Sequence, residues 1–443
     1  MITATSMCQI IEKEDDHGGD FPSSLPGFQT YPSGRDGILR TATHWINGKR
    51  HDDNIGDFWR VHDKLYDLTN FVQRHPGGAY WLEVTRGTDV TEAFESHHLT
   101  DNAEMILKKY FVREIEEPRN SPYTFKSDGF YKVLKRRVAK ELPTIPYQGR
   151  TVKWHNVLLW SFFASFFLSG LYSSTLMIVL AGAILALLTN CSHNFYHKSN
   201  NWRMYAWDLS GLSSAEWRVS HAVSHHGFAN TIYDYELSSF EPIFDFKPKG
   251  KNKVNRFVVP IFSWFLFLGL NHKTLIERMV VIATGKQKLR PENLLPFVEL
   301  ALLMFLSDDG WRLWNILMCS SSFWFGFVGL IAAHHHPDIF HEGDAPRYSL
   351  DWGLCQLDAV RDRWDVNSSD FLIATMYGEH TLHHLFPTID HDKLPFLNHI
   401  LVDTAKEFGI KEIEANRKYD FLKLWIGMYA QLIRNTPRTL KGQ

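Results

Sequence analysis

Cysteine is scarce in this chain of 443 residues, which has only four, namely Cys8, Cys191, Cys319 and Cys355. Their spacings match no zinc-binding or redox motif, and so few cysteines do not build a disulfide framework. Net charge is also nearly absent, at −2, so nothing draws the whole chain to nucleic acid. The first forty residues lack the apolar run of a signal peptide. The sequence therefore predicts a protein that faces a reducing, cytosolic environment and does not bind nucleic acid.

The mean hydropathy of the whole chain is only −0.23, because its apolar residues are concentrated in a few stretches among polar ones. Residues 156–190 contain no Asp, Glu, Lys or Arg. As one helix they would be about 50 Å long, against a hydrocarbon core of about 30 Å. They therefore predict a helical hairpin that turns near residues 170–174. Residues 294–306 and 313–333 predict a second hairpin, of which the first arm is the weaker because it contains Pro296 and Glu299.

Basic residues set the orientation that we expect for these hairpins. Residues 247–256 carry five positive charges, and loops rich in Lys and Arg face the cytosol. The apolar run 257–270 is short and has basic residues on both sides, so we expect it to lie in the membrane interface. The two hairpins then give four crossings of an integral membrane protein, with both termini in the cytosol.

Histidine is abundant, and eight of the 23 histidines fall into three short motifs, HNFYH, HAVSHH and HTLHH. These motifs contain His193 and His197, then His221, His225 and His226, and then His380, His383 and His384. Helical residues three or four positions apart share a face, so the members of each motif can point the same way. Neutral imidazole is a good ligand for iron, copper, nickel or zinc. Eight ligands are too many for one tetrahedral ion, so the motifs predict a site for two metal ions on the cytosolic side.

The spacing HX3H, HX3HH and HX2HH around apolar hairpins resembles the membrane fatty-acid desaturases and hydroxylases. This resemblance covers about residues 150–410 and implies a non-haem di-iron centre held by the eight histidines. It also implies an extra ligand from the segment AAHHHPDIFHEGD after the last predicted span. We assign that ligand to His334, with His335 and His336 as the alternatives.

Residues 44–117 form a second module, in which His75-Pro76-Gly77-Gly78 follows a strand-like pattern and GTDVTEAFESHHL ends on two histidines. This module resembles the haem-binding domain of cytochrome b5. The resemblance implies a haem b whose iron is ligated by His75 and His98, with His97 as the runner-up to His98. Two axial imidazoles leave no open position on the iron, so such a haem carries electrons.

The expected fold class is α+β. We expect a disordered arm over residues 1–43, a cytochrome b5-like haem domain over 44–117 and a linker over 118–150. An all-α membrane desaturase-like domain with about four transmembrane helices in two hairpins follows over 151–443. The basic linker segment KVLKRRVAK predicts a helix that lies on an anionic membrane surface or exposes a solvated face. After the third motif the pattern predicts amphipathic cytosolic helices.

Together the two resemblances imply an oxygen-dependent lipid oxidoreductase, a fatty-acyl desaturase of the endoplasmic reticulum membrane. Its substrates would be an acyl lipid and O2, and the fused haem would receive electrons from an NADH-dependent reductase of the cytochrome b5 reductase type. A lipid hydroxylase on the same site, or a membrane-bound haem electron carrier without di-iron activity, are the alternatives. Bulky Phe195 and Tyr196, His380 in place of Gln, and the HHHP segment depart from the common pattern. They resemble the insect-type cytochrome b5-related branch, whose substrate the resemblance does not settle.

Overall fold

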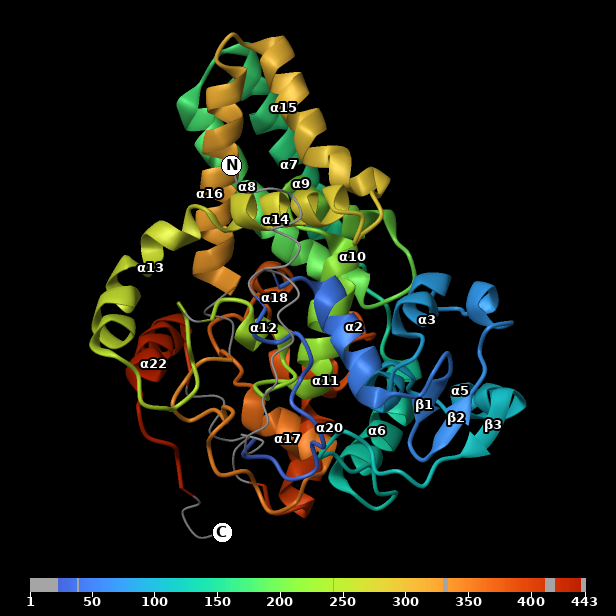
Figure 1. The fold of residues 1–443 in the computed structure, drawn as a ribbon. Helices are drawn as coiled ribbons and strands as arrows, with labels where there is room; N and C mark the ends of the chain where they lie inside the picture. The colour runs from blue at the N-terminus through green and yellow to red at the C-terminus, as the bar shows by residue number, and fades with distance from the viewer. Residues whose placement is uncertain (1–22, 38–39, 242, 330–333, 411–418, 440–443) are drawn as a thin grey trace.

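The computed structural model describes residues 23–37, 40–241, 243–329, 334–410 and 419–439. A helical body carries a column of long helices at one end and a small module with the described sheet at its side (Figure 1). The mixed fold class predicted from the sequence is therefore confirmed in outline, with a small N-terminal module that contains the sheet and a mostly helical second part.

The module that follows the N-terminal segment is built around an antiparallel sheet of order β1-β2-β3. Trp59 and Val61 of this sheet are buried in its apolar core. The strands are β1 (Trp59–Val61), β2 (Lys64–Tyr66) and β3 (Phe111–Glu114). Short helices surround them, namely α2 (Ala42–Asp53), η1 (Val72–Arg74), α3 (Ala79–Thr85), α4 (Thr91–His97), α5 (Asn102–Leu107) and η2 (Lys108–Tyr110).

The basic linker segment forms helix α6 (Phe130–Glu141), whose apolar face is buried against α17 and α20 of the helical body. Its lysines do not all point to solvent or to a membrane surface. Lys132 and Lys135 each place Nζ 2.8 Å from a carboxylate oxygen of Glu95 in α4. The helix therefore clamps the small module onto the body, which neither sequence interpretation of this segment anticipated.

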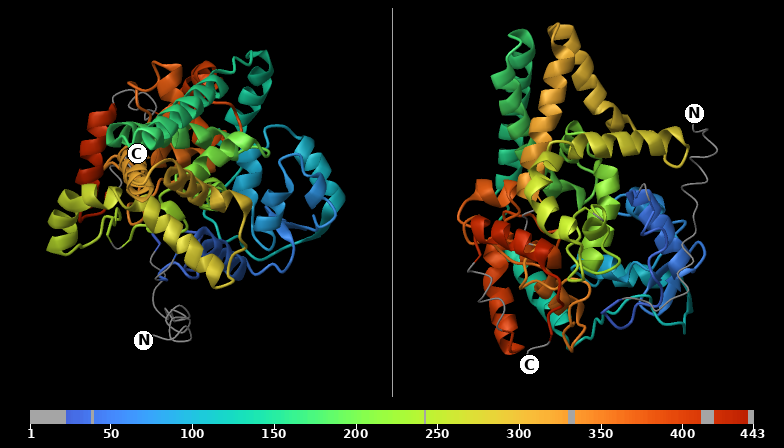
Figure 2. Two further views of the ribbon diagram at one scale, coloured as in Figure 1. Left: turned by 90° about the horizontal axis from the view of Figure 1, so that it is seen from above. Right: turned by 60° about the vertical axis from the view of Figure 1, so that its left-hand side comes forward.

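Four helices form the projecting column, as two views show (Figures 1 and 2). They are α7 (Arg150–Leu171), α8 (Thr175–Tyr196), α15 (Leu295–Leu306) and α16 (Gly310–Gly329). The turn between α7 and α8 falls where the sequence predicted it, and α15 and α16 form the second hairpin. A Cβ on Gly182 of α8 would lie 2.5 Å from Cβ of Ser320 in α16, so only glycine allows these helices to approach so closely.

The remaining helices of the body are short. Before the column's second hairpin they are η3 (Leu142–Thr144), η4 (Trp202–Tyr205), α9 (Ala206–Leu209), α10 (Ser214–Trp217), η5 (Arg218–His225), α11 (His226–Phe228), α12 (Tyr235–Ser238), η6 (Val254–Val258), α13 (Val259–Phe267), α14 (Leu270–Ala283) and η7 (Pro291–Leu294). After it they are α17 (Trp352–Ala359), α18 (Asp370–Thr375), α19 (His380–Leu385), α20 (Leu394–Glu407) and α22 (Phe421–Ile433).

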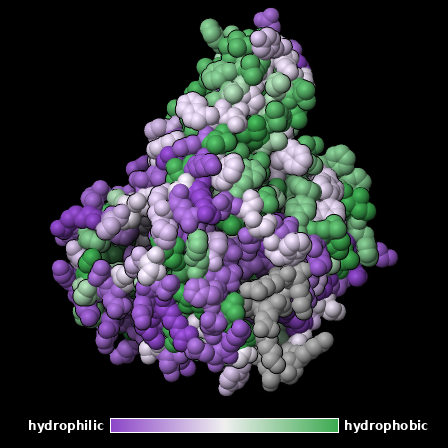
Figure 3. Space-filling view, turned by 180° about the vertical axis from the view of Figure 1, so that it is seen from behind, coloured by the Kyte–Doolittle hydropathy of each residue, from purple (hydrophilic) through white to green (hydrophobic). Residues whose placement is uncertain are grey.

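Apolar side chains cover the outside of the column, whereas the lower body is largely hydrophilic (Figure 3). Among the described helices, α8 alone is long and apolar enough by itself to cross a membrane. The continuous helix of η6 and α13 (Val254–Phe267) and helix α14 are bent by 76° at their junction, and they pass the same test only as one broken pair. The four crossings predicted from the sequence therefore stay a prediction. Exposed Ile261, Phe262 and Phe265 on α13 agree with a segment that lies in an interface.

Part of the N-terminal segment packs against the body, although the sequence predicts a disordered arm there. Residues 1–22 lie outside the described residues. The backbone N–H of Ser24 donates to Glu342 Oε1 at 2.5 Å, and buried Arg35 donates two hydrogen bonds of 3.0 Å to the carboxylate of Glu241. These long-range polar contacts hold residues 23–37 against the body in a way that local composition does not reveal.

Candidate metal and haem centres

The three histidine motifs meet below the column, although more than 150 residues separate the second from the third. The first motif stands at the C-terminal end of α8, the second on η5 and α11, and the third on α19. Every one of the eight histidines is buried. His334, just after the undescribed residues 330–333, lies among them. The structure therefore brings together all nine histidines that the sequence assigns to the metal site.

The nine histidines divide into two adjacent groups. The first group contains five residues, namely His193, His197, His221, His226 and His383. One ring nitrogen of each lies within 4.8 Å of one ring nitrogen of every other member. The second group contains His225, His334 and His384, and His380 joins it because its Nε2 lies 2.8 Å from Nε2 of His334. Two metal ions would use these donors fully, whereas one tetrahedral ion would not.

The second motif splits between the groups because η5 is a π-helix rather than an α-helix. An α-helix would align His221 with His225, four residues on, as the sequence analysis assumed. The wider turn brings Nε2 of His226 to 3.0 Å from Nε2 of His221 instead, and His225 turns toward His334 at 3.2 Å. Single π-turns of this kind are frequent at functional sites.

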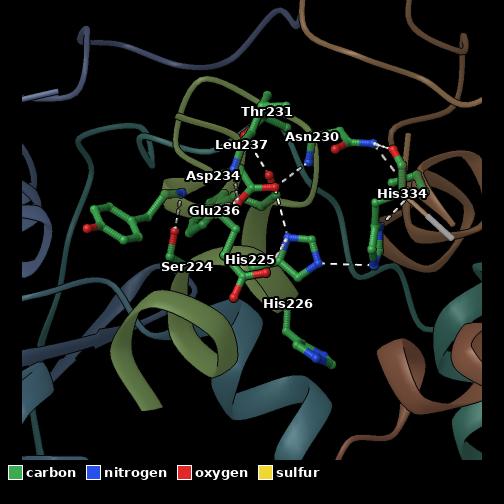
Figure 4. Close-up of polar contacts among 12 residues, drawn as sticks. Ser224, His225, His226, Asn230, Thr231, Asp234, Glu236, Leu237 and His334 are labelled. Carbon is green, nitrogen blue, oxygen red and sulfur yellow. Dashed lines mark hydrogen bonds and ion pairs between the residues drawn. The ribbon is translucent and has the colours of Figure 1, made fainter. Parts of the chain in front are cut away.

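Hydrogen bonds fix which nitrogen several of these rings present. Nδ1–H of His225 donates to Asp234 at 2.9 Å and that of His221 to Glu236 at 2.8 Å, as Figure 4 shows for the first pair. Nδ1–H of His334 donates to the carbonyl of Ala359 at 3.0 Å. In its neutral form each ring therefore presents Nε2 to a metal, the arrangement usual around metal-bound histidine.

Burial keeps most of the cluster neutral. It lowers the pKa of His226 and of His383 well below the usual value, so both rings offer a free lone pair. Burial would also lower the pKa of His225, but Asp234 and Glu236 outweigh it and raise that pKa to about 9. Metal binding at His225 must therefore release a proton.

Three residues near the cluster were not anticipated from the sequence. The ring centroid of buried His391 lies 4.5 Å from that of His383, and the ring centroid of Tyr377 lies 5.1 Å from that of His193. Nδ1 of His384 lies 3.1 Å from Oε1 of Gln356. No short motif contains these residues with their histidines, because helix packing alone brings them together.

The neighbouring histidines of the HHHP segment have other contacts. His335 stacks on Phe246 with ring centroids 3.6 Å apart, and His336 packs against Tyr419 at 5.1 Å. Neither belongs to the two groups, so His334 alone of these three lies at the cluster. Glu299, in α15, is buried and its carboxylate has no hydrogen-bond partner among the described residues.

The haem-type module places His75 and His98 opposite each other, with ring centroids 6.2 Å apart. Nδ1–H of His75 donates to the carbonyl of Gly78 at 3.0 Å and that of His98 to the carbonyl of Phe94 at 2.9 Å. Both rings therefore have Nε2 available for one iron atom between them. A Cβ on Gly77 would lie 2.8 Å from Cε1 of His75, so a larger residue at this position would clash with the His75 ring. Burial lowers the pKa of His98 to about 4, which keeps it neutral.

His97 turns away from this pair. Its ring packs between Trp81, at 5.8 Å, and His197 of the metal cluster, at 6.1 Å between centroids. The geometry thus favours His98 over His97 as the residue that faces His75.

A cavity of about 180 Å³ leads to the cluster from the base of the column. Its inner end is lined by His221, His225, His334 and His380. Its walls include the apolar residues Leu212, Leu237, Phe240, Leu270 and Phe325. Charged residues of both signs also border it, among them Arg40, Lys273 and Glu277, and the last two form an ion pair of 2.8 Å. The cavity therefore offers an apolar chain a path to the histidines and a polar group a charged border.

Comparisons with known proteins agree with this arrangement. Residues 171–415 match the fatty acid desaturase family, and residues 47–116 match the cytochrome b5-like haem/steroid binding domain. A cytochrome b5-related protein of Drosophila melanogaster is 40% identical over 428 residues, which covers 92% of this chain and 95% of that protein. An acyl-lipid (8-3)-desaturase of Mortierella alpina is 24% identical, over 83% of this chain and 91% of that enzyme. No solved structure matches. The chain belongs to the fatty acid desaturase family and carries a fused cytochrome b5-like domain.

Proposed function

We propose that this protein is an oxygen-dependent lipid oxidoreductase, a fatty-acyl desaturase that receives electrons through its fused haem domain. One observation carries the proposal, the convergence of nine buried histidines into two adjacent groups. Carboxylates and a backbone carbonyl orient several of these rings, so their Nε2 atoms face inward. A structural zinc site needs only four donors, so this number of ligands favours a dinuclear redox centre.

Iron suits this donor set, since imidazole binds it well. When bound, two irons supply the redox chemistry that uses dioxygen to oxidise an unactivated C–H bond. The first group would hold one ion, and His225, His334, His380 and His384 would hold the other. Asp234 and Glu236 keep their histidines oriented, and burial of the whole cluster excludes bulk water.

The cavity supports a lipid substrate. An acyl chain would lie along Leu212, Leu270 and Phe325 and present one of its carbons to the histidines at the inner end. The charged residues at its border, among them Arg40, Lys273 and Glu277, would face the polar carrier or head group. The apolar column beside the cavity (Figure 3) would anchor the enzyme in the lipid phase, in the endoplasmic reticulum membrane with the metal site in the cytosol.

The haem module supplies the electrons in this proposal. With His75 and His98 as axial ligands the haem has no position for oxygen. An NADH-dependent reductase of the cytochrome b5 reductase type would reduce it. Covalent fusion then makes delivery to the metal site intramolecular.

Lipid profiling tests the proposal. The protein is expressed in a host with a simple fatty-acid set, beside a variant with His383→Ala and His384→Ala. A desaturase yields acyl chains that have lost two hydrogens, and a hydroxylase yields chains that have gained one oxygen. Unchanged lipids in both strains, with haem bound but no non-haem iron, would contradict the proposal.

A membrane-bound haem electron carrier is the second candidate. It is favoured by the name of the 40% identical relative, a cytochrome b5-related protein, which mentions no desaturase activity. A carrier needs no second metal, so iron content separates the two functions.

A further inference from the structure

The haem module contacts the helical body through α3 and the C-terminal end of α4. Tyr80 donates its hydroxyl hydrogen to the carbonyl of Ala215 at 2.6 Å, and Nε1–H of Trp81 donates to the carbonyl of Lys198 at 3.3 Å. The guanidinium of Arg218 lies 5.0 Å from the centre of the Trp81 ring. Because Lys198 follows His197, these contacts hold the module beside the first histidine motif.

His97 lies in this contact, next to the haem-module residue His98 in the chain and close to the metal-cluster residue His197 in space. Through the chain it is bonded to His98, and through space its ring lies 6.1 Å from that of His197. Its Nδ1–H donates to the carbonyl of Ala93 at 3.0 Å, which fixes the ring. Nε2 of His97 and Nδ1 of His197 are both buried and have no hydrogen-bond partner among the described residues. Such buried nitrogens are uncommon and call for an explanation.

We propose that His97 is the bridge through which electrons pass from the haem to the metal cluster, with Trp81 holding its ring against His197. This inference rests on the proposed function. Along the route His98, His97 and His197, only the step between the last two rings crosses between side chains. In each transfer the ferrous haem loses one electron and becomes ferric. The metal pair gains that electron, and no bond forms or breaks. The NADH-dependent reductase then returns the haem to its ferrous state.

A second close approach between the two parts, at Gly78, does not lead to a metal ligand. A Cβ on Gly78 would lie 3.6 Å from Oδ1 of Asn200. That oxygen accepts a hydrogen bond of 2.8 Å from Arg218, and Arg218 contacts backbone carbonyls rather than the cluster. The pair His97 and His197, with ring centroids 6.1 Å apart, therefore gives a more direct connection than the approach at Gly78.

Electron transfer without turnover tests this bridge. The full-length protein is loaded with haem and ferric iron, kept free of oxygen and added lipid, and its haem is reduced by a flash-generated reductant. The haem absorbance then reports the rate at which the electron leaves. His97→Leu should slow this rate by about tenfold or more, the range usual for residues one contact away from a metal ligand. Trp81→Leu should slow it less, because it only loosens the position of His97.

Tyr80→Phe is the matched control, since it removes a hydrogen bond of the same contact but lies off the route. It should transfer electrons at the wild-type rate. The low-spin haem spectrum and the iron content should be the same in all variants, and hydrogen–deuterium exchange over residues 78–98 should show that the module stays docked. His97→Gln, a polar replacement, provides a second variant if His97→Leu fails to fold.

Three results would overturn the bridge. One is an unchanged rate in His97→Leu or His97→Gln while the wild type transfers normally, which would leave the proposed function intact. The second is an equal slowing in Tyr80→Phe, which would show that docking alone matters. The third is loss of the low-spin spectrum in the His97 variants, which would make His97 a haem ligand. A wild-type haem that stays ferrous beside bound ferric iron would instead contradict the proposed function itself.

Discussion

Replacing Asp234 by Asn changes one charge beside the cluster and little else in shape. Oδ2 of Asp234 accepts hydrogen bonds from Nδ1–H of His225 at 2.9 Å and from the backbone N–H of Asn230 at 2.8 Å. Oδ1 caps helix α12 by accepting from the N–H groups of Glu236 and Leu237 (Figure 4). An Asn keeps one oxygen but places an NH2 group against donors on its other side. Either the cap or the contact with His225 is then lost.

The expected loss of metal affinity follows from that contact. A hydrogen bond to a charged group contributes about 1.5–3 kcal/mol, and about 1.4 kcal/mol corresponds to a tenfold change in affinity. If His225 moves its proton to Nε2 to accept from the new NH2 group, its ligating nitrogen is blocked as well. We expect Asp234→Asn to bind iron about 10–100-fold more weakly, while the haem spectrum is unchanged.

A chelator competition titration, with haem content as the internal standard, measures this loss. Asp420→Asn is the control, because Asp420 caps α22 in the same manner but binds Lys423 rather than a histidine. Since Asn and Asp are similar N-caps, the control should bind iron like the wild type. Wild-type affinity in Asp234→Asn, or an equal loss in Asp420→Asn, would refute the role of this carboxylate.

Three further predictions concern the ion pair between Arg119 and Asp89, the cavity and the third motif. Nε of Arg119 lies 2.7 Å from Oδ2 of buried Asp89. Burial by itself raises the pKa of Asp89, but the positive charges of Arg119 and Lys49 outweigh burial and lower that pKa to about 2. The fall from 3.8 corresponds to about 2 kcal/mol at 1.36 kcal/mol for each pKa unit, present above pH 4 and lost as the pH falls toward 2. Arg119→Ala should therefore lower the free energy of unfolding at pH 7 by about that amount in denaturant titrations, and an equal loss at pH 2 would contradict this. Gly329→Leu should fill cavity space, since among the described residues a Cβ there meets only Phe325, at 3.9 Å. Lipid oxidation should fall on the order of tenfold to a hundredfold with haem and iron retained, and undiminished oxidation would place the substrate elsewhere. His380→Gln should retain measurable iron and some oxidation while His383→Ala loses oxidation but keeps haem, and complete loss in both would make His380 indispensable.

The sequence predicted the parts of the site that local spacing encodes. Histidines three or four residues apart on one helix, and a glycine pair after His75, are visible without knowing the fold. The turn after α7 was also predictable, because an uncharged stretch too long for one crossing must reverse direction. These features depend on neighbours along the chain, so periodicity and charge suffice to find them.

Contacts made by distant segments could not be predicted in this way. The π-turn that aligns His221 with His226 depends on how η5 packs, and HAVSHH by itself is equally compatible with an α-helix. The pairing of Lys132 and Lys135 with Glu95, and the ordering of residues 23–37 against Glu342 and Glu241, join segments far apart in sequence. The position of His97 between Trp81 and His197 likewise appears only when the two domains are placed together.

The iron content of the purified full-length protein tests the central claim most directly. Iron is measured together with haem in the wild type and in the variant with His383→Ala and His384→Ala. If the two histidine groups form a dinuclear centre, the wild type should hold about two non-haem irons for each haem. The variant should lose most of that iron and keep its haem. A wild type with haem but without non-haem iron, or a variant that binds as much iron as the wild type, would contradict the account.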